Sequence, residues 1–283
     1  MSFWMRAAFG PTTLLVLLWS SGALFAKWGL AYASAYAFLC LRFALALAVL
    51  VAMALLRGRP LLPRAGTRGR VAATGFLLSG CYAVTYLLAL DHGVTPGVLA
   101  TTLGVQPILT LVLTERPLSA RRLAGLLLAL AGLALVVYDS IAAARFSVAG
   151  IAFALAALGC MTAGTLLQKG LDQAPADVLP LQYAVSLALC LALLPLQPLR
   201  VQWSVGLAAS LLAMGVVISV VATLLLYRLI RERNLVNVTS LFYLVPAGTA
   251  LLDWLVLGNR LAPLAIAGMG AIVGGLLLVF RRS

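Results

Sequence analysis

The 283-residue chain is far more apolar than a soluble protein, because 64% of its residues are hydrophobic and 10% are charged. Soluble domains carry roughly 25% charged residues. Apolar runs recur from end to end, and a helix needs about 20 such residues to cross a membrane. The strands of a membrane barrel would alternate between apolar and polar residues instead. The sequence therefore predicts an all-α polytopic membrane protein.

The formal net charge of +13 would suggest a nucleic-acid partner if the chain were soluble. In a membrane protein, Lys and Arg in the loops set the orientation, and no soluble segment combines basic and aromatic residues. We therefore expect no nucleic-acid partner. The cysteines lie within apolar runs and form no CxxC pair, so they are expected to pack as small hydrophobic residues. We expect no metal and no cofactor. The four are Cys40, Cys81, Cys160 and Cys190.

Ten apolar runs have the length of membrane-spanning helices, and short connections join them. The predicted spans are Thr13–Ala31, Ser34–Leu56, Val71–Leu90, Thr95–Thr114, Arg122–Tyr138, Val148–Lys169, Val178–Leu196, Gly206–Ile230, Val236–Leu257 and Pro263–Phe280. With a cytoplasmic N-terminus, fifteen of the 20 Lys and Arg residues fall on the inner side and four on the outer side, with Arg42 inside a span. The excess of inner positive charge predicts that both termini are cytoplasmic.

The second half of the chain repeats features of the first half. Pro107 recurs as Pro246 at an offset of 139, and two glycines recur at an offset of 143. Because five spans per half is an odd number, the second copy enters the membrane inverted relative to the first. We predict two inverted five-helix repeats, at residues 1–140 and 141–283. The glycine pairs are Gly125 with Gly268, and Gly132 with Gly275.

Inverted repeats are typical of secondary transporters that work by alternating access. Polar groups at membrane depth must face protein or a water-filled cavity, so we expect several polar helix faces to line a central cavity. Alternatively, the Ser and Thr hydroxyls bond backbone carbonyls or neighbouring helices. The candidate cavity residues are Trp19, Arg42, Ser79, Tyr82, Tyr86, Thr102, Gln106, Thr165, Ser219, Thr223 and Tyr243.

Arg42 is the one charged residue deep within a predicted span. An arginine in the membrane is costly, so its side chain should face the interior and have a partner. It could bind the carboxylate of a substrate, or it could brace the helices through backbone carbonyls or Asp253. Both alternatives stay open at this point.

Two proline-containing helices are candidate hinges. Each proline removes a helix hydrogen bond, and a glycine one turn before Pro107 makes bending easier. The helices could bend during gating or hold a static kink. We predict gating or hinge roles for Gly104, Pro107, Tyr227 and Pro246. The tryptophans near span ends are expected to anchor the chain at the membrane interface, and they are Trp4, Trp28, Trp203 and Trp254.

Several motifs taken together resemble the EamA-type branch of the drug/metabolite transporter superfamily. They are LWSSGALFAKWGL in the first span, LRFALA in the second, the proline helices ending in LTERPL and LGNRL, and the glycine-spaced fifth and tenth spans. The resemblance covers about Leu14 to Phe280. It implies a ten-helix bacterial inner-membrane exporter of amino acids or related metabolites.

The expected function is therefore export of amino acids or similar small metabolites by a secondary transporter, which could act as a facilitator. No carboxylate lies at mid-membrane to couple protons, and no nucleotide-binding motif is present. The alternatives are a proton-coupled carrier of sugars, nucleotide sugars or drugs, and outside transport a lipid-handling scaffold or a membrane enzyme. An enzyme would need convergent His, Asp or Cys residues, so we expect none. The expected partners are a small-molecule substrate and the lipid bilayer, with the chain a monomer or a weak homo-oligomer.

Overall fold

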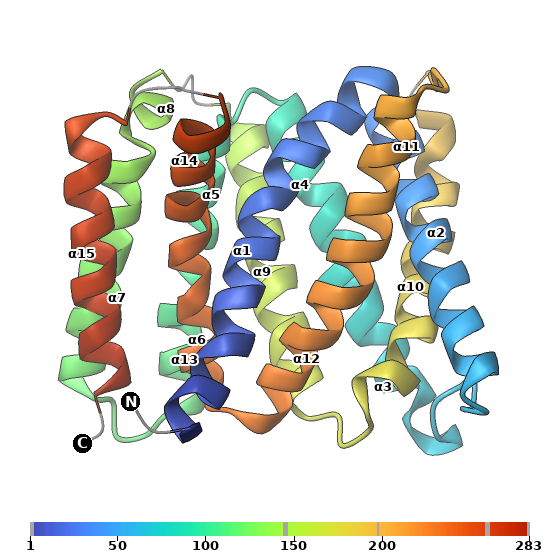
Figure 1. Cartoon of the computed structure of the whole chain (residues 1–283), viewed down its shortest axis with the longest axis horizontal. Coiled ribbons are helices and arrows are strands. Elements are labelled where there is room, and N and C mark those ends of the chain that lie inside the picture. Colours follow the sequence, from blue (N-terminus) through green and yellow to red (C-terminus); the bar gives the residue numbers. More distant parts are fainter. Residues whose placement is uncertain (1–2, 144–146, 197, 258–260, 282–283) are drawn as a thin grey trace. The chain divides into compact units, whose positions relative to one another are not determined.

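The computed structural model describes residues 3–143, 147–196, 198–257 and 261–281. The side chains of residues 3–9, 23, 253, 256 and 257 lie outside that description, and with them the side chains of Trp4 and Asp253. Within the described residues the chain folds into helices joined by short connections (Figure 1). This confirms the predicted all-helical fold.

The helices follow the predicted spans closely, except that α1 begins at Phe3, ten residues before the predicted start at Thr13. The first half contains α1 (Phe3–Tyr32), α2 (Ala35–Leu56), η1 (Ala65–Thr67), α3 (Arg68–Gly75), η2 (Phe76–Cys81), α4 (Tyr82–Asp91), α5 (Pro96–Leu103), α6 (Gln106–Thr114), α7 (Ala120–Val136) and α8 (Tyr138–Ala142). The second half contains α9 (Val148–Lys169), α10 (Pro175–Leu193), η3 (Leu194–Leu196), α11 (Val205–Leu211), η4 (Leu212–Ala222), α12 (Thr223–Glu232), α13 (Leu235–Ser240), η5 (Leu241–Tyr243), α14 (Leu244–Leu257) and α15 (Pro263–Phe280).

Nine helical spans in the described part of the chain are long and apolar enough to cross a membrane. They correspond to nine of the ten predicted spans. The predicted fifth span is α7, whose 17 residues make it shorter than the other nine. At a rise of 1.5 Å per residue, α7 is about 26 Å long, slightly less than the roughly 30 Å of the hydrocarbon core.

Several helices begin at a residue whose side chain caps the first turn. The Oγ1 of Thr95 accepts a hydrogen bond from the N–H of Val98, and Pro96 takes the first helical position of α5. Ser204 and Asn234 accept comparable bonds at the starts of α11 and α13. Such caps satisfy N–H groups that have no partner within the helix, so short connections suffice between spans.

The helices form two compact units. Unit 1 consists of Met1–Ser21, Thr85–Thr162 and Arg233–Ser283, and unit 2 of Gly22–Val84 and Ala163–Glu232. The two units are not the two sequence repeats, since each unit draws helices from both halves. The division of the sequence at residue 140 stays a prediction.

In unit 1, α7 and α15 pack against each other through the predicted glycine pairs and lie side by side (Figure 1). A Cβ atom on Gly125 would lie 2.6 Å from the carbonyl oxygen of Gly275, and one on Gly132 would lie 2.6 Å from that of Gly268. The helices are therefore antiparallel, and the two contacts exchange under the offset of 143. This reciprocal pairing is what two inverted copies of one helix produce.

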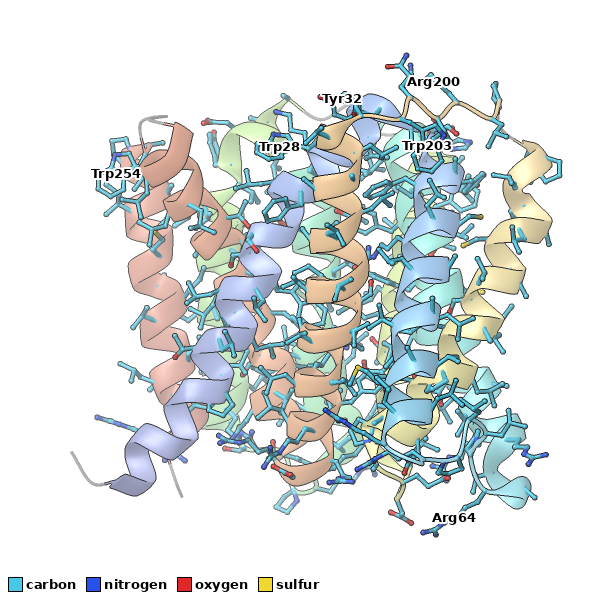
Figure 2. All side chains as sticks on the ribbon, turned by 45° about the vertical axis from the view of Figure 1, so that its right-hand side comes forward. Trp28, Tyr32, Arg64, Arg200, Trp203 and Trp254 are labelled. Atoms are coloured by element: carbon cyan, nitrogen blue, oxygen red, sulfur yellow. The ribbon has the colours of Figure 1, made fainter. Side chains whose placement is uncertain are left out.

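Unit 2 has chemically different ends. Arg64 lies at one end, whereas Trp28, Tyr32, Arg200 and Trp203 lie at the other (Figure 2). Trp28 and Trp203 are exposed, as expected of residues that anchor a protein at a membrane interface. In unit 1, α1 begins and α15 ends at the same end (Figure 1). The cytoplasmic location of that end stays a prediction.

The close contact between α7 and α15 predicts a sharp difference between two glycines of α15. In Gly268→Ala the new methyl group would lie 2.5 Å from the Gly132 carbonyl oxygen and 2.9 Å from the Val136 nitrogen. Since backbone atoms must then move apart, we expect a loss of about 1–3 kcal/mol of stability. The measurement is thermal unfolding of the purified protein in detergent.

The matched control is Gly270→Ala, because a Cβ atom there meets no described atom within 4 Å. Alanine favours a helix over glycine by about 1 kcal/mol, so this variant should be as stable as the parent chain or slightly more stable. Equal melting temperatures for the two variants would contradict the observed helix packing.

Candidate functional site

Helices α2 and α10, the second spans of the two halves, contain similar eight-residue segments and pack together in unit 2. Residues 41–48 read LRFALALA and residues 181–188 read LQYAVSLA, an offset of 140. The offset pairs Phe43 with Tyr183, and the rings of these two residues lie 5.6 Å apart between centroids. It also pairs Arg42 with Gln182. Equivalent positions of the two repeats are thus in contact, and the polar residue beside each ring differs, Arg42 in one repeat and Gln182 in the other.

The side chain of Arg42 is half-buried and is held in place by one hydrogen bond. Its Nε donates to the Oγ of Ser219 at 2.7 Å, and its Cζ lies 5.7 Å from the centroid of the Phe43 ring. Among the side chains that the structure describes, no carboxylate forms an ion pair with Arg42. This bond fixes Nε, and because the terminal N–H groups bond to none of the described residues, they are available to a ligand.

Ser219 belongs to η4, an eleven-residue π-helical segment. Its hydroxyl donates to the carbonyl of Met214 at 2.8 Å, and that of Thr223 donates to Ile218 at 3.1 Å, each five residues back. The backbone carbonyl of Ser219 accepts a bond of 2.5 Å from the hydroxyl of Tyr183. π-Helical turns are uncommon and occur often at functional sites. Here the segment presents Ser219 to Arg42 of α2 and to Tyr183 of α10, and Thr223, the first residue of α12, follows directly after it.

The third span has a π-helical segment at the equivalent place. It is η2, which contains Ser79 and is followed by Tyr82. Ser79 and Ser219 are related by the same offset of 140 that relates Arg42 to Gln182. Ser79 lies near the hydroxyl of Tyr227, although that buried oxygen has no hydrogen bond of good geometry within the described residues.

Two buried glutamines, Gln168 of α9 and Gln182 of α10, are hydrogen-bonded to each other in unit 2. The Nε2 of Gln182 donates to the Oε1 of Gln168 at 2.9 Å, and both side chains are buried. The Oε1 of Gln182 has no hydrogen-bond partner among the described residues. A buried polar atom without a partner is costly, so Gln182 and the hydroxyl of Tyr227 are two places where a ligand or water would be stabilised.

In unit 1 the fourth span is broken at the predicted hinge. Helix α5 ends at Leu103 and α6 begins at Gln106. The N–H of Ile108 bonds the carbonyl of Val105 rather than that of Gly104. The hydroxyl of Tyr243 bonds the Gly104 carbonyl instead, at 2.6 Å. A tyrosine from the ninth span therefore stabilises the break in the fourth.

The ninth span is also broken, by the 3₁₀ turn η5 between α13 and α14, three residues before Pro246. Tyr243 lies in this turn. The distance in sequence from Gly104 to Tyr243 is 139, the offset that relates Pro107 to Pro246. The two broken helices thus touch at equivalent positions, and their role as gating hinges stays a prediction.

Helix α1 packs on the ninth span beside this break. The ring of Trp19 makes an edge contact with that of Phe242, with 5.6 Å between centroids. The hydroxyl of Ser20 donates to the carbonyl of Val245 at 3.1 Å, and Thr249 returns a bond of 3.0 Å to the carbonyl of Ser20. Trp19 is therefore positioned by its contact with η5 and by the bonds of its neighbour Ser20 to α14, and its ring remains half-buried.

The remaining residues that were predicted to line the cavity have the following surroundings. The hydroxyl of Thr102 bonds the carbonyl of Val98 in its own helix at 2.9 Å, as the structural alternative expected. Tyr86 packs in an apolar cluster that includes Ala89 and Leu99. Gln106 and Thr165 are buried. That all of the predicted faces line one cavity stays a prediction.

The sequence analysis did not predict a cluster of four hydrogen-bonded polar residues, which lies in unit 1 where α6 ends and α7 and α13 begin. Glu115 pairs with Arg122 and accepts a hydrogen bond of 2.9 Å from Asn234. Arg122 also donates to Asn234 at 3.0 Å and to Asn237 at 2.5 Å. Tyr183 and Gln182 were missed as well. Aligning residues 41–48 with 181–188 would have found both of these.

The described fold is that of a polytopic helical membrane protein with two inverted repeats. The EamA-like transporter family model matches the chain twice, at residues 12–138 and 148–281. The chain belongs to this family and is therefore a membrane transporter of the drug/metabolite type. A solved crystal structure covers 95% of the chain with 95% of its own, at a TM-score of 0.81 and 20% sequence identity, which shows a shared fold. No functionally curated protein shows a detectable sequence match.

The bond between Tyr243 and Gly104 generates a prediction. In Tyr243→Phe the ring stays and the Gly104 carbonyl loses its donor inside the protein, which costs about 1–3 kcal/mol. We expect a lower melting temperature in detergent. Tyr138→Phe is the control, because Tyr138 is exposed. A melting temperature for Tyr243→Phe equal to that of the control would rule out this role.

Proposed function

We propose that the protein exports amino acids or similar small metabolites across a bacterial inner membrane as a secondary transporter. Membership of a transporter family supports transport as such. We choose a solute that has a carboxylate and no net charge because Arg42 is a cation that pairs with no described carboxylate. One fixed cation suits one carboxylate, whereas a phosphorylated solute would require a cluster of basic groups.

The observation that carries the proposal is that Arg42, in a membrane-spanning helix of unit 2, forms no ion pair with any side chain that the structure describes. A structural arginine in an apolar surrounding is expected to be paired with a carboxylate or with carbonyls. The described bond of Arg42 goes to a serine hydroxyl through Nε. The planar terminal N–H groups match the two oxygens of a carboxylate. Arg42 is the group that we assign to the carboxylate of the substrate.

The neighbours of Arg42 supply the rest of a small-molecule site. Phe43 and Tyr183 give an aromatic wall, while Ser219 and Thr223 provide hydroxyl groups. Sites for small molecules combine apolar and aromatic walls with a few polar groups that fix orientation. A substrate with one carboxylate and a small apolar or polar side chain fits this combination.

Alternating access supplies the transport mechanism that we propose. Two inverted repeats can exchange conformations, which opens a site to one side of the membrane and then to the other. The reciprocal contacts at the glycines of α7 and α15 and at Gly104 and Tyr243 support this symmetry. The helix breaks beside Pro107 and Pro246 are places where such an exchange could bend the chain.

The experiment is counterflow into liposomes that contain the purified protein, with labelled amino acids, sugars and nucleotides, with and without a pH gradient. We expect uptake of one or more amino acids without need of the gradient. Absence of flux for every amino acid would contradict the proposal. If transport of amino acids required the gradient, the protein would be a proton-coupled exporter and not a facilitator.

Arg42→Gln tests the carboxylate assignment. We expect the apparent affinity for the transported amino acid to fall about tenfold to a hundredfold, the value of a hydrogen bond to a charged group. The corresponding amine, which has no carboxylate, should compete equally well against the parent chain and the variant. A structural role would instead weaken acid and amine alike. Arg200→Gln, at an exposed loop, is the charge-matched control and should transport normally.

A further inference from the structure

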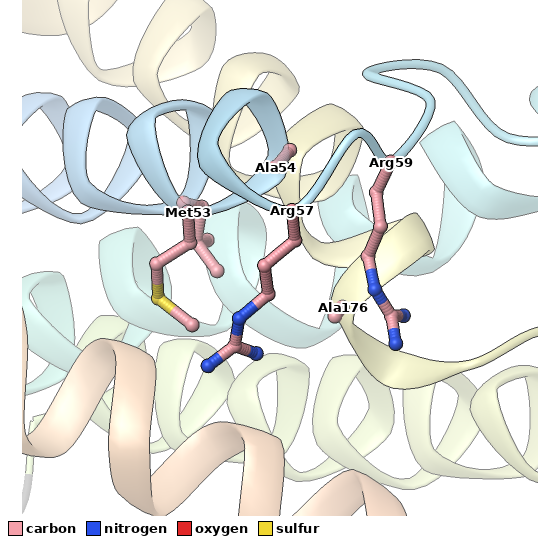
Figure 3. Close-up of a pocket in the computed structure, with 6 residues that line it drawn as sticks. Met53, Ala54, Arg57, Arg59 and Ala176 are labelled. Carbon is pink, nitrogen blue, oxygen red and sulfur yellow. The ribbon is translucent and has the colours of Figure 1, made fainter.

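A small pocket in unit 2 lies at the end of α2, away from Arg42 and its neighbours. It is lined by Leu50, Met53, Ala54, Arg57, Arg59 and Ala176. Figure 3 shows the side chains of Arg57 and Arg59 projecting to the same side, with Ala176 between them. The pocket thus combines two cations with an apolar wall. The proposed transport mechanism makes no use of it.

The two arginines differ in their partners. Arg59 donates to the Oδ1 of Asp177 at 3.2 Å, and its side chain remains 43% exposed. The exposed guanidinium of Arg57 forms no ion pair or hydrogen bond with any other residue that the structure describes. Asp177 offsets one of the two positive charges. Arg57 is therefore the principal anion-binding group of the pocket, and Arg59 is the secondary one.

The third side of the pocket is the first turn of α10. The helix begins at Pro175, and Ala176 in that first turn lines the pocket. The N–H groups of a first turn have no acceptors within the helix and carry a partial positive charge. In α10, Pro175 has no N–H and the N–H of Asp177 bonds the carbonyl of Ala174 at 2.9 Å, so the N–H of Ala176 is what this turn adds to the attraction that Arg57 exerts on an anion.

The apolar wall shows what kind of anion fits. Met53 and Leu50 line the pocket beside Arg57, and the next residues toward the end of α2, Leu55 and Leu56, are 64% and 87% exposed. Long apolar side chains next to arginines mark the level where hydrocarbon meets head groups. A free phosphate would use the arginines alone. A phospholipid would use the arginines and the apolar wall together.

We propose that this pocket binds the phosphate of an anionic phospholipid head group, with the acyl chains against the apolar side of α2. Basic pockets between membrane helices are general sites for such lipids. The segment that follows α2 carries three further arginines, Arg64, Arg68 and Arg70, none of which lines the pocket. The proposal therefore distinguishes Arg57 from the rest of the basic loop.

The experiment measures the thermal stability of the full-length, delipidated protein in detergent during titration with phosphatidylglycerol. Phosphatidylcholine, inorganic phosphate and glycerol phosphate are titrated in parallel. We expect phosphatidylglycerol to raise the melting temperature at concentrations where the other three have no effect. An equal shift with inorganic phosphate would identify a free-anion site and overturn the lipid proposal, as would an equal shift with phosphatidylcholine.

Arg57→Gln and Arg64→Gln form a matched pair of variants. Both remove one exposed positive charge from the same segment, and Arg57 alone of the two lines the pocket. We expect Arg57→Gln to raise the phosphatidylglycerol concentration at half-maximal shift about tenfold, and Arg64→Gln to change it little. Equal effects of the two variants would show general attraction of the loop to anionic lipid and overturn the proposal.

Ala176→Glu is a second test, which keeps both arginines and places a carboxylate between them. The like charge should weaken lipid binding at least as much as Arg57→Gln does. If Arg57→Gln fails to fold, this variant decides alone. Unchanged binding of phosphatidylglycerol by Ala176→Glu would then overturn the site.

Discussion

The structure depends on close contact between equivalent parts of two inverted repeats. At the contact of α7 with α15, glycines bring two backbones so near that no Cβ atom fits at Gly125, Gly132, Gly268 or Gly275. Hydrophobicity does not distinguish one helix from another inside a membrane, so such packing by small residues selects the partner. The same rule holds in unit 2, where Gly75 meets Gln182 and Gly215 meets Arg42, again at an offset of 140.

Within this symmetric frame the polar residues are not symmetric. The position equivalent to Arg42 is a glutamine, and the position equivalent to Phe43 is a tyrosine. Arg42 bonds the serine of one π-helical segment, whereas Gln182 bonds Gln168 on α9. A solute with one charged end and one neutral end is itself asymmetric. The difference between Arg42 and Gln182 gives such a solute a direction within an otherwise twofold arrangement.

Much of the fold could be predicted from the sequence, because membrane helices have a simple signature. Length and hydrophobicity located most of the spans within a few residues, although α1 begins ten residues before its predicted start, and the offsets of prolines and glycines indicated the inverted repeats. The break at Gly104 follows from a proline that lacks an N–H. The π-helical segments could not be predicted, since a shift from four to five residues per backbone bond leaves the same apolar composition. Partners of single residues, such as Tyr243 for the Gly104 carbonyl, depend on tertiary packing.

The candidate site shows the same division. Arg42, Ser219 and Thr223 could be named because a charge or hydroxyl at membrane depth is conspicuous in sequence. Tyr183 was passed over because it was weighed as a single aromatic residue among many. Aligned with the first half, it occupies the place of Phe43 and adds a hydroxyl there, and that hydroxyl bonds the carbonyl of Ser219. In a duplicated chain, the twofold symmetry is broken at aligned positions whose side chains differ chemically. A directional substrate requires such positions, so the differences between the copies are better evidence of function than the features they share.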